Sequence, residues 1–202
     1  MPDYALDLVG HTLEYVEDEH IYLVDGVIVP SITQMLKSRF GGKYDGVSPT
    51  TLNRAAEAGT AVHTAIERYC ECGEASDLPE VRNFAFLQKQ YNFEVVANEV
   101  PVILFDDSEP IAAGRLDLVL RLPHMNGQIG GADIKRTSTL DKEYLAYQLN
   151  LYRIAYRQCY GVTWEFLRGI HLRGDVRKYV VIPINEQMTL EFIGEWRRQN
   201  AV

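Results

Sequence analysis

The strongest constraint on the fold is a strict alternation of apolar residues interrupted by charged ones. In residues 114–122 a leucine stands at every second position from residue 116 onward, which is the period of a β-strand. This alternation puts Asp117 on the face opposite the leucines, together with Arg115. About one hairpin later, Asp133 and Lys135 share one face of a second apolar strand. The sequence therefore predicts that two strands bring two carboxylates and an ammonium group to one place.

Such a cluster suits chemistry at a phosphodiester. A hard divalent cation prefers oxygen ligands, and attack on a phosphodiester is helped by a cation, a positioned water and a fixed positive charge. An Asp–Lys pair on a solvated strand would be an ordinary alternative. We favour the site, because the neighbouring residues 131, 132 and 134 look buried and isolated buried charges are costly without partners.

The rest of the chain predicts a mixed α+β fold in a single domain, residues 1–202. Periodicity predicts strands over residues 13–16, 21–24, 27–29, 93–104, 111–122, 128–137, 163–172 and 176–183. Capping residues and apolar stripes predict helices beginning near residues 31, 48, 79, 142 and 185. We divide the domain into an N-terminal hairpin and short helix (1–47), a core (48–183) and a C-terminal helix (184–202). The glycine-rich segment 40–46 is the best candidate for a mobile loop.

The charge is unevenly distributed. The net charge of −8 argues against a protein that coats nucleic acid by bulk electrostatics. Residues 1–109 hold 7 Lys and Arg against 19 Asp and Glu, a balance of −12, whereas residues 110–202 hold 13 against 9, a balance of +4. The positive half carries the predicted cluster, which suits a polyanionic substrate, although an ordinary solvated surface would give the same counts.

Nothing in the sequence indicates a membrane. No apolar stretch approaches membrane-spanning length, and the N-terminus lacks a basic region followed by an apolar one. We expect a cytoplasmic protein with no membrane partner.

Five segments, in this order, resemble the PD-(D/E)XK nuclease superfamily, and most closely its RecB-like branch, which includes phage-type exonucleases. They are Gly59–His63, Asn98–Val102, Gly114–Asp117, Asp133–Lys135 and Gln148–Tyr152. A lone Asp-x-Lys triplet is common by chance, but five ordered elements are specific. The resemblance implies a restriction-endonuclease-like core, a central mixed β-sheet flanked by helices.

The resemblance also implies an activity, that of a metal-dependent DNA exonuclease in phage or prophage recombination or DNA processing. Two alternatives stay open. One is a structure-specific or restriction-like endonuclease on the same core. The other is a non-catalytic nucleic-acid-binding subunit that keeps the fold.

By resemblance, a divalent metal, Mg²⁺ or Mn²⁺, would be held by Asp117, Asp133, the carbonyl of Ile134, and His63. The histidine could instead be an ordinary packing residue of its helix. An imidazole ligand makes Mn²⁺ at least as acceptable as Mg²⁺. Glu99 would complete the acidic cluster, unless it is a solvated edge carboxylate.

The catalytic residues implied are Asp117, Asp133, Lys135 and Glu99. The ammonium of Lys135 could orient the attacking water and offset charge that grows in the transition state. Substrate positioning is assigned to the pair Gln148 and Tyr152, which stand one helical turn apart. Four arginines are candidates for phosphate contacts, each with a solvated side chain as the alternative: Arg54, Arg136, Arg153 and Arg157.

The partners implied are DNA, a phage single-strand annealing protein, and other copies of the chain in a homo-oligomer. Several RecB-like relatives carry an iron–sulfur cluster on four cysteines. This chain has three, Cys70, Cys72 and Cys159, so no such cluster is expected.

Overall fold

The computed structural model describes residues 3–17, 19–42 and 46–200. The strands are β1 (Tyr4–Leu8), β2 (His11–Val16), β3 (Ile21–Val24), β4 (Val27–Val29), β5 (Glu94–Asp106), β6 (Glu109–Leu122), β7 (Gln128–Lys135), β8 (Phe166–Arg173) and β9 (Val176–Ile182). The helices are α1 (Ile32–Phe40), α2 (Pro49–Cys72), α3 (Pro79–Tyr91), α4 (Lys142–Tyr160) and α5 (Glu186–Asn200), with a 3₁₀ turn at Pro123–Met125. Residues 43–45 of the predicted mobile loop lie outside the described residues.

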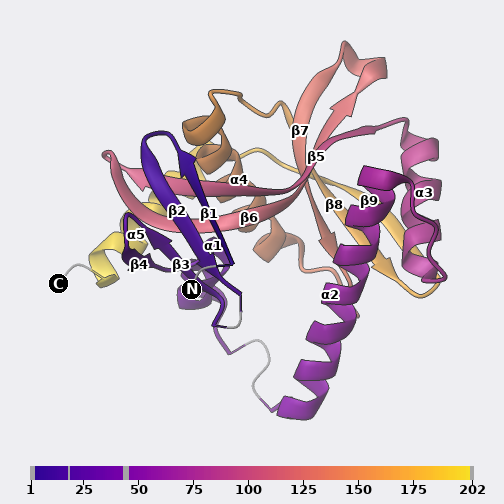
Figure 1. The fold of residues 1–202 in the computed structure, drawn as a ribbon, viewed down its shortest axis with the longest axis horizontal. Helices are drawn as coiled ribbons and strands as arrows, with labels where there is room; N and C mark the ends of the chain where they lie inside the picture. The colour runs from indigo at the N-terminus through magenta and orange to yellow at the C-terminus, as the bar shows by residue number, and fades with distance from the viewer. Residues whose placement is uncertain (1–2, 18, 43–45, 201–202) are drawn as a thin grey trace.

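The central sheet has the order β5-β6-β7-β8-β9 and is mixed. β7 and β8 run parallel, whereas the other neighbours run antiparallel. A parallel pair needs a crossover connection, and α4 provides it between β7 and β8 (Figure 1). The predicted mixed α+β fold is confirmed.

The N-terminal region is larger than the predicted hairpin. It is a four-stranded antiparallel sheet of order β1-β2-β3-β4. The sequence analysis missed β1, which pairs with β2 from Tyr4↔Tyr15 to Leu8↔His11. A five-residue edge strand gives a weak periodic signal, and its partner supplies the hydrogen bonds. The amide of Ala113 donates to the carbonyl of Pro30 at 3.0 Å, which links this sheet to β6.

Side-chain caps account for the predicted starts of α1, α2 and α5. Ser31 and Gln34 form the predicted capping box of α1, with the Ser31 hydroxyl 3.0 Å from the Gln34 amide. Ser48 caps α2 and is followed by a proline in the first turn. The Asn185 side chain accepts from the amide of Met188 at the start of α5. Each cap satisfies an amide that has no partner inside the helix, so these boundaries follow from short-range sequence.

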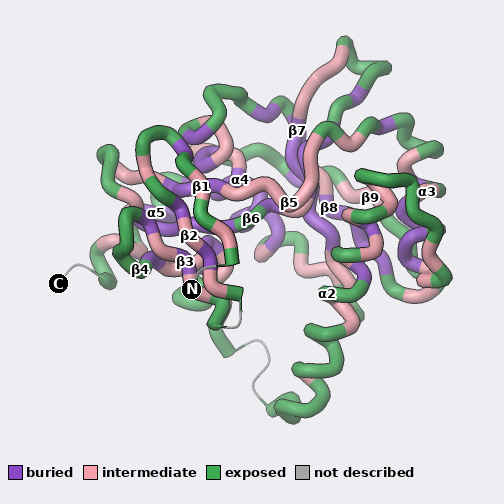
Figure 2. Tube along the Cα trace, viewed as in Figure 1, coloured by how far each residue is buried: buried purple, intermediate pink, exposed green. Residues whose placement is uncertain are grey.

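Helices cover both faces of the central sheet, so its buried residues fall into two clusters (Figure 2). α2 and α3 pack on one face through Val62, Ile66 and Phe84. α4 packs on the other through Leu145 and Leu149, in a cluster that also includes α1, α5 and the N-terminal sheet. None of the described helices is long and apolar enough to cross a bilayer.

A buried carboxylate ties α3 to the end of β7 and to the β8–β9 turn. Glu80 is 2% exposed, and its Oε1 accepts from Arg136 Nε at 3.0 Å and from the Gly174 amide at 3.1 Å. Burial acts to raise the pKa of Glu80, but these hydrogen bonds outweigh it and lower the pKa below its usual range. The ionised side chain therefore stabilises the fold above the carboxyl pKa of the unfolded chain, and this stabilisation is lost as the pH falls through the lowered pKa of the folded state.

We therefore expect Glu80→Gln to lower the free energy of unfolding at neutral pH by about 1–3 kcal/mol, because two donors lose a charged acceptor. The difference from wild type should narrow as the pH falls below the carboxyl pKa of the unfolded chain. Urea unfolding between neutral and acid pH measures this. The matched control is Glu74→Gln, in an exposed pair 3.9 Å from Arg68, which should change stability by less than about 1 kcal/mol. Equal effects of the two substitutions would contradict the assignment.

Candidate metal centre

Three carboxylates form a row across neighbouring strands of the central sheet. The pairs Asn98↔Leu118 and Val100↔Leu116 place Glu99 of β5 opposite Asp117 of β6. The last pair of β6 with β7 is Leu118↔Ala132, so the next residues in register are Asp117 and Asp133. Antiparallel neighbours at the same level of a sheet point their side chains to the same face. The register therefore gathers the three carboxylates that the sequence analysis had assigned to one site.

The regular ladder is broken at this row. Glu99 has φ of 48°, in the left-handed region that residues other than glycine rarely occupy. On the other side, Oδ2 of Asp117 accepts a hydrogen bond from the Ile134 amide at 2.6 Å, so a side chain takes the place of a backbone partner. Strained backbone of this kind persists where the surroundings hold it and is concentrated at functional sites.

His63 reaches the row from α2. Its Nε2 donates to the carbonyl of Ile134 at 3.2 Å, and its Nδ1 lies 3.7 Å from both Glu99 Oε1 and Asp117 Oδ1. Ligand-type atoms of His63, Glu99 and Asp117 all lie within 4.8 Å of one another. Burial acts to lower the pKa of His63, but the negative charges of Asp117, Glu99 and Asp133 raise it to about 9. The imidazole thus sits in a strongly negative environment.

Asp133 and Lys135 form a buried ion pair beside this group. Nζ of Lys135 is 2.7 Å from Oδ2 of Asp133, whose side chain is 3% exposed. Burial raises the pKa of Asp133 above its usual range. Burial opposes protonation of Lys135, but the charges of Asp133 and Asp117 outweigh it and raise the pKa of the ammonium. Lys135 is therefore held as a fixed positive charge.

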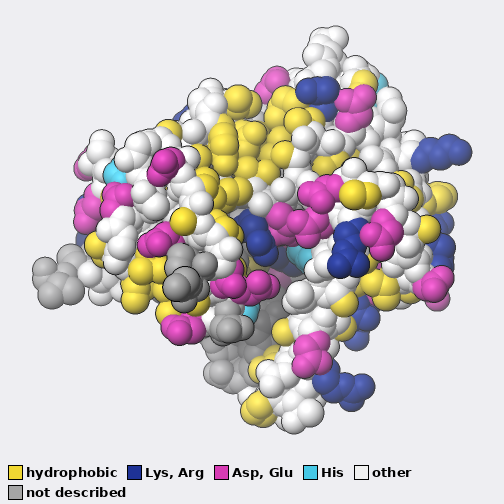
Figure 3. Space-filling view, viewed as in Figure 1, with side chains coloured by type: hydrophobic (Ala, Val, Ile, Leu, Met, Phe, Trp, Pro, Cys, Tyr) yellow, Lys and Arg dark blue, Asp and Glu magenta, His cyan; other side chains and the backbone are white. Residues whose placement is uncertain are grey.

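Two further charged residues belong to the cluster and were given no role in the sequence analysis. Arg115 lies 2.7 Å (Nε) from Oε2 of Glu99, which leaves the other carboxylate oxygen toward His63. Glu67 follows His63 by one turn of α2, and burial followed by the charge of Glu99 raises its pKa. The alternation had placed Arg115 on the face of Asp117, and helical spacing from His63 could have indicated Glu67. Figure 3 shows acidic, basic and histidine side chains gathered in the recess between α2 and the N-terminal sheet.

Gln148 and Tyr152 lie on the α4 side of the sheet, and both are buried. Tyr152 donates its hydroxyl to the carbonyl of Arg115 at 3.1 Å. A Cβ added at Gly114 would lie 3.0 Å from that hydroxyl oxygen, so any side chain there would require the Tyr152 ring to shift by a few tenths of an ångström. Oε1 of Gln148 has no hydrogen-bond partner among the described residues. Tyr152 thus positions the backbone next to Asp117, and Gln148 keeps an acceptor free.

The face of β6 that carries Asp117 is more enclosed than the alternation suggested. Val119, on the same face, is fully buried and packs in the α4 cluster. Asp117 itself remains 14% exposed. The site is therefore a semi-buried position between two packed layers and not an open sheet surface.

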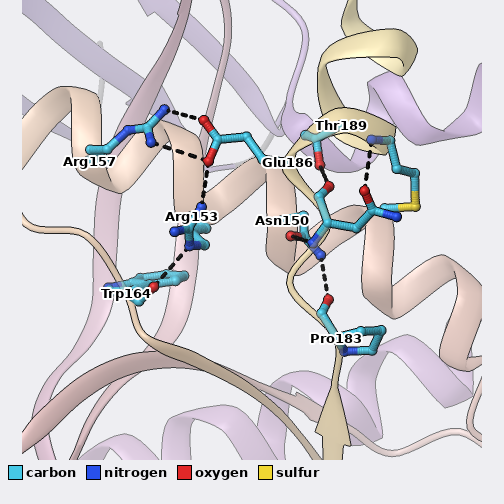
Figure 4. A network of polar contacts seen from close by, with 9 residues as sticks. Asn150, Arg153, Arg157, Trp164, Pro183, Glu186 and Thr189 are labelled. Atoms are coloured by element: carbon cyan, nitrogen blue, oxygen red, sulfur yellow. Dashed lines mark hydrogen bonds and ion pairs between the residues drawn. The ribbon is translucent and has the colours of Figure 1, made fainter.

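Two of the four predicted phosphate-binding arginines are engaged elsewhere. Arg153 is 11% exposed, donates to the carbonyl of Trp164 at 2.9 Å and pairs with Glu186 at 3.0 Å. Arg157 binds the same carboxylate at 2.9 Å, so both residues hold α4 against the start of α5 (Figure 4). Their guanidinium groups are therefore already bound to Glu186, and a role at substrate phosphates stays a prediction. Local sequence patterns do not reveal these contacts, because Glu186 lies 33 residues from Arg153 and 29 residues from Arg157.

The other two arginines differ from each other. Arg136 follows Lys135 directly, but its guanidinium is used by Glu80 at 3.0 Å and is 29% exposed. Arg54 is exposed on the first half of α2, and no ion pair joins it to another described residue. Arg54 alone among the four keeps an unengaged guanidinium within the described part of the chain.

The donors at the row fit a divalent cation. Two carboxylates and an imidazole form a mainly oxygen set with one nitrogen, which Mn²⁺ and Mg²⁺ accept. The Ile134 carbonyl lies at the other imidazole nitrogen, Nε2, and not among these donors. The close group consists of His63, Glu99 and Asp117. Asp133 lies on the next strand of the row, β7, and its carboxylate is bound by Lys135. It would therefore reach such a metal only from the β7 side.

The chain was compared with known proteins. No family model matches the sequence, and no curated protein matches it. Among solved structures, the crystal structure of SSO0001 is similar, with 14% sequence identity over 85% of this chain and 76% of that chain, at a TM-score of 0.45.

If this group holds a metal, Mn²⁺ should raise the melting temperature of the protein. A ligand at 100 times its Kd stabilises the folded state by about 2.7 kcal/mol. Asp117→Asn keeps an acceptor for the Ile134 amide but removes the charge, so it should abolish the shift, and His63→Ala should reduce it. Differential scanning fluorimetry with and without Mn²⁺ measures both.

The control is His11→Ala, a histidine that pairs with Asp25 at 2.7 Å in the N-terminal sheet, and it should keep the full shift. A wild-type protein indifferent to Mn²⁺, or an Asp117→Asn variant with the wild-type shift, would contradict a metal centre here.

Proposed function

We propose that the chain is a divalent-metal-dependent deoxyribonuclease that hydrolyses phosphodiester bonds, acting as an exonuclease on DNA in the cytoplasm. The observation that carries the proposal is the row Glu99, Asp117 and Asp133 with Lys135 beside it and His63 over it. This combination supports the proposal, because three carboxylates, a distorted backbone and a buried ammonium at one level of the sheet are features that concentrate at functional sites.

The resemblance to the PD-(D/E)XK superfamily supports the same reading. Its Asp-x-Lys triplet lies at residues 133–135, and its preceding acidic residue is Asp117, on the adjacent strand. The mixed central sheet with helices on both faces agrees with the core that this resemblance implies. RecB-like recombination and a single-strand annealing partner remain proposals that rest on the resemblance alone.

The residues of the chain have distinct tasks in such a reaction. A bound Mg²⁺ or Mn²⁺ would polarise the phosphodiester and lower the pKa of the attacking water. His63, Glu99 and Asp117 would hold it. Lys135, kept charged by Asp133, would orient the water and stabilise the negative charge that develops on the phosphate oxygens. Arg115 holds Glu99 in place through the oxygen that faces away from His63.

A direct test is digestion of end-labelled linear DNA and covalently closed circular DNA in parallel, with Mg²⁺, Mn²⁺ or EDTA. We expect loss of the linear substrate from its ends with either metal, no loss with EDTA, and an intact circle. Cleavage of the circle would favour an endonuclease on the same core. Metal-dependent binding of DNA without cleavage of either substrate would favour the non-catalytic subunit.

Substitutions in the buried pair should separate catalysis from folding. We expect Asp133→Asn and Lys135→Met each to lower the cleavage rate by at least about 10²-fold, as loss of one transition-state charge does elsewhere. Each single change also leaves a buried partner uncompensated, so it should lower stability by about 3–5 kcal/mol. The double variant removes both charges and should recover stability but not activity.

Single-turnover rates, measured well below each melting temperature, check this prediction, and Lys89→Ala on the exposed end of α3 serves as the control. If activity returned together with stability in the double variant, the pair would be structural, and the proposed catalytic role of Lys135 would be wrong.

A further inference from the structure

A pocket of about 600 Å³ opens beside the candidate site and has no task in the scheme above. Its walls come from α1, the start of α2, the end of β7 and the start of α4, and they include Thr33, Lys37, Phe40, Lys135, Leu140 and Tyr144. The volume lies in the range of pockets that enclose a small molecule or one nucleotide. Lys135 belongs both to this wall and to the ion pair with Asp133. Whatever fills the pocket therefore lies next to the reacting phosphate.

The lining combines flat apolar surface with positive charge. The rings of Phe40 and Tyr144 meet edge to face, with centroids 5.4 Å apart, and both residues are half-buried. Lys37 and Lys135 contribute two ammonium groups. Among the described residues of the wall, Asp141 is the one acidic residue, and it accepts from the Tyr144 amide at the cap of α4. An apolar aromatic wall with cations at its rim complements a nucleobase attached to a phosphate.

We infer that this pocket receives the base of one unpaired nucleotide next to the scissile phosphate. The inference rests on the proposed function and sharpens it, because it defines the substrate as a strand that is single or locally unpaired at the site. A base inside a duplex is stacked and paired, so it could not enter a pocket between α1 and α4 without leaving the helix. The contact is with the base face, so it should tolerate all four bases.

The test uses single-stranded oligonucleotides in which one abasic nucleotide is moved along the strand. With wild-type protein and Mn²⁺, we expect the abasic residue to lower kcat/KM about tenfold or more at one position relative to the cleaved bond, and little elsewhere. Thr33→Trp and Leu140→Trp fill the pocket from opposite walls. Each should lower kcat/KM for intact DNA and make intact and abasic strands equal. Two independent variants guard against one that fails to fold, which the melting temperature reports.

Ser38→Trp is the matched control, because it adds the same side chain to an exposed position of α1 that does not line this pocket. It should keep the wild-type preference for intact strands. Wild-type cleavage that ignores the abasic residue at every position, or a preference that survives in both filled variants, would overturn the inference while leaving nuclease activity intact.

If wild-type protein cleaves nothing, fluorescence anisotropy with Ca²⁺ and the same oligonucleotides decides the question. Weaker binding of abasic strands, lost in the filled variants, would sustain the pocket and reject hydrolysis. Equal binding of intact and abasic strands would reject both.

Discussion

The hydrogen bond from the Ile134 amide to the Asp117 carboxylate is the contact on which the candidate site depends. It replaces a backbone–backbone hydrogen bond at the point where β6 and β7 stop pairing, and so it fixes Asp117 beside Asp133. The carbonyl of Ile134 accepts a hydrogen bond from His63, and this contact brings α2 to the row. The backbone of Ile134 in β7 thus connects β6 and α2 to the same point. A backbone amide is a strong and obligatory donor, so this geometry does not depend on a flexible partner.

The electrostatics of the row follow from its burial. Carboxylates at one level of a sheet repel one another, and water is largely excluded, so the repulsion is weakly screened. The chain offsets it with three cations at defined oxygens: Lys135 on Asp133, Arg115 on Glu99, and His63 between Glu99 and Asp117. The pKa of His63 is raised because the negative charges of the row act on its imidazole. A divalent cation would relieve the same repulsion. Under the proposed function, local contacts of this kind would let a protein with a net charge of −8 bind a polyanion.

The scaffold around the row is built to hold it rigidly. Asn150 of α4 is 1% exposed and bonds to Ala146, Pro183 and Asn185, which joins α4 to the start of α5 (Figure 4). Arg153 and Arg157 strengthen the same junction through Glu186. These residues act on the site only through the position of α4, whose Tyr152 supports the Arg115 backbone. Charged residues on a helix next to a site can therefore stabilise helix packing and need not bind substrate.

The sequence by itself determined the helices, most of the strands and five residues of the cluster, because alternation, capping and apolar stripes are short-range signals. Asp117, Asp133 and Lys135 could be placed on one face by strand period alone, and His63 and Glu99 by resemblance. Tertiary structure alone decided the left-handed backbone of Glu99, the pairing of Arg115 with it, and the loss of Arg153 and Arg157 to Glu186. Each depends on strand register or on partners tens of residues away. Local pattern carries no information about such partners, since the free energy of a charged contact is set by which group the folded chain brings within reach.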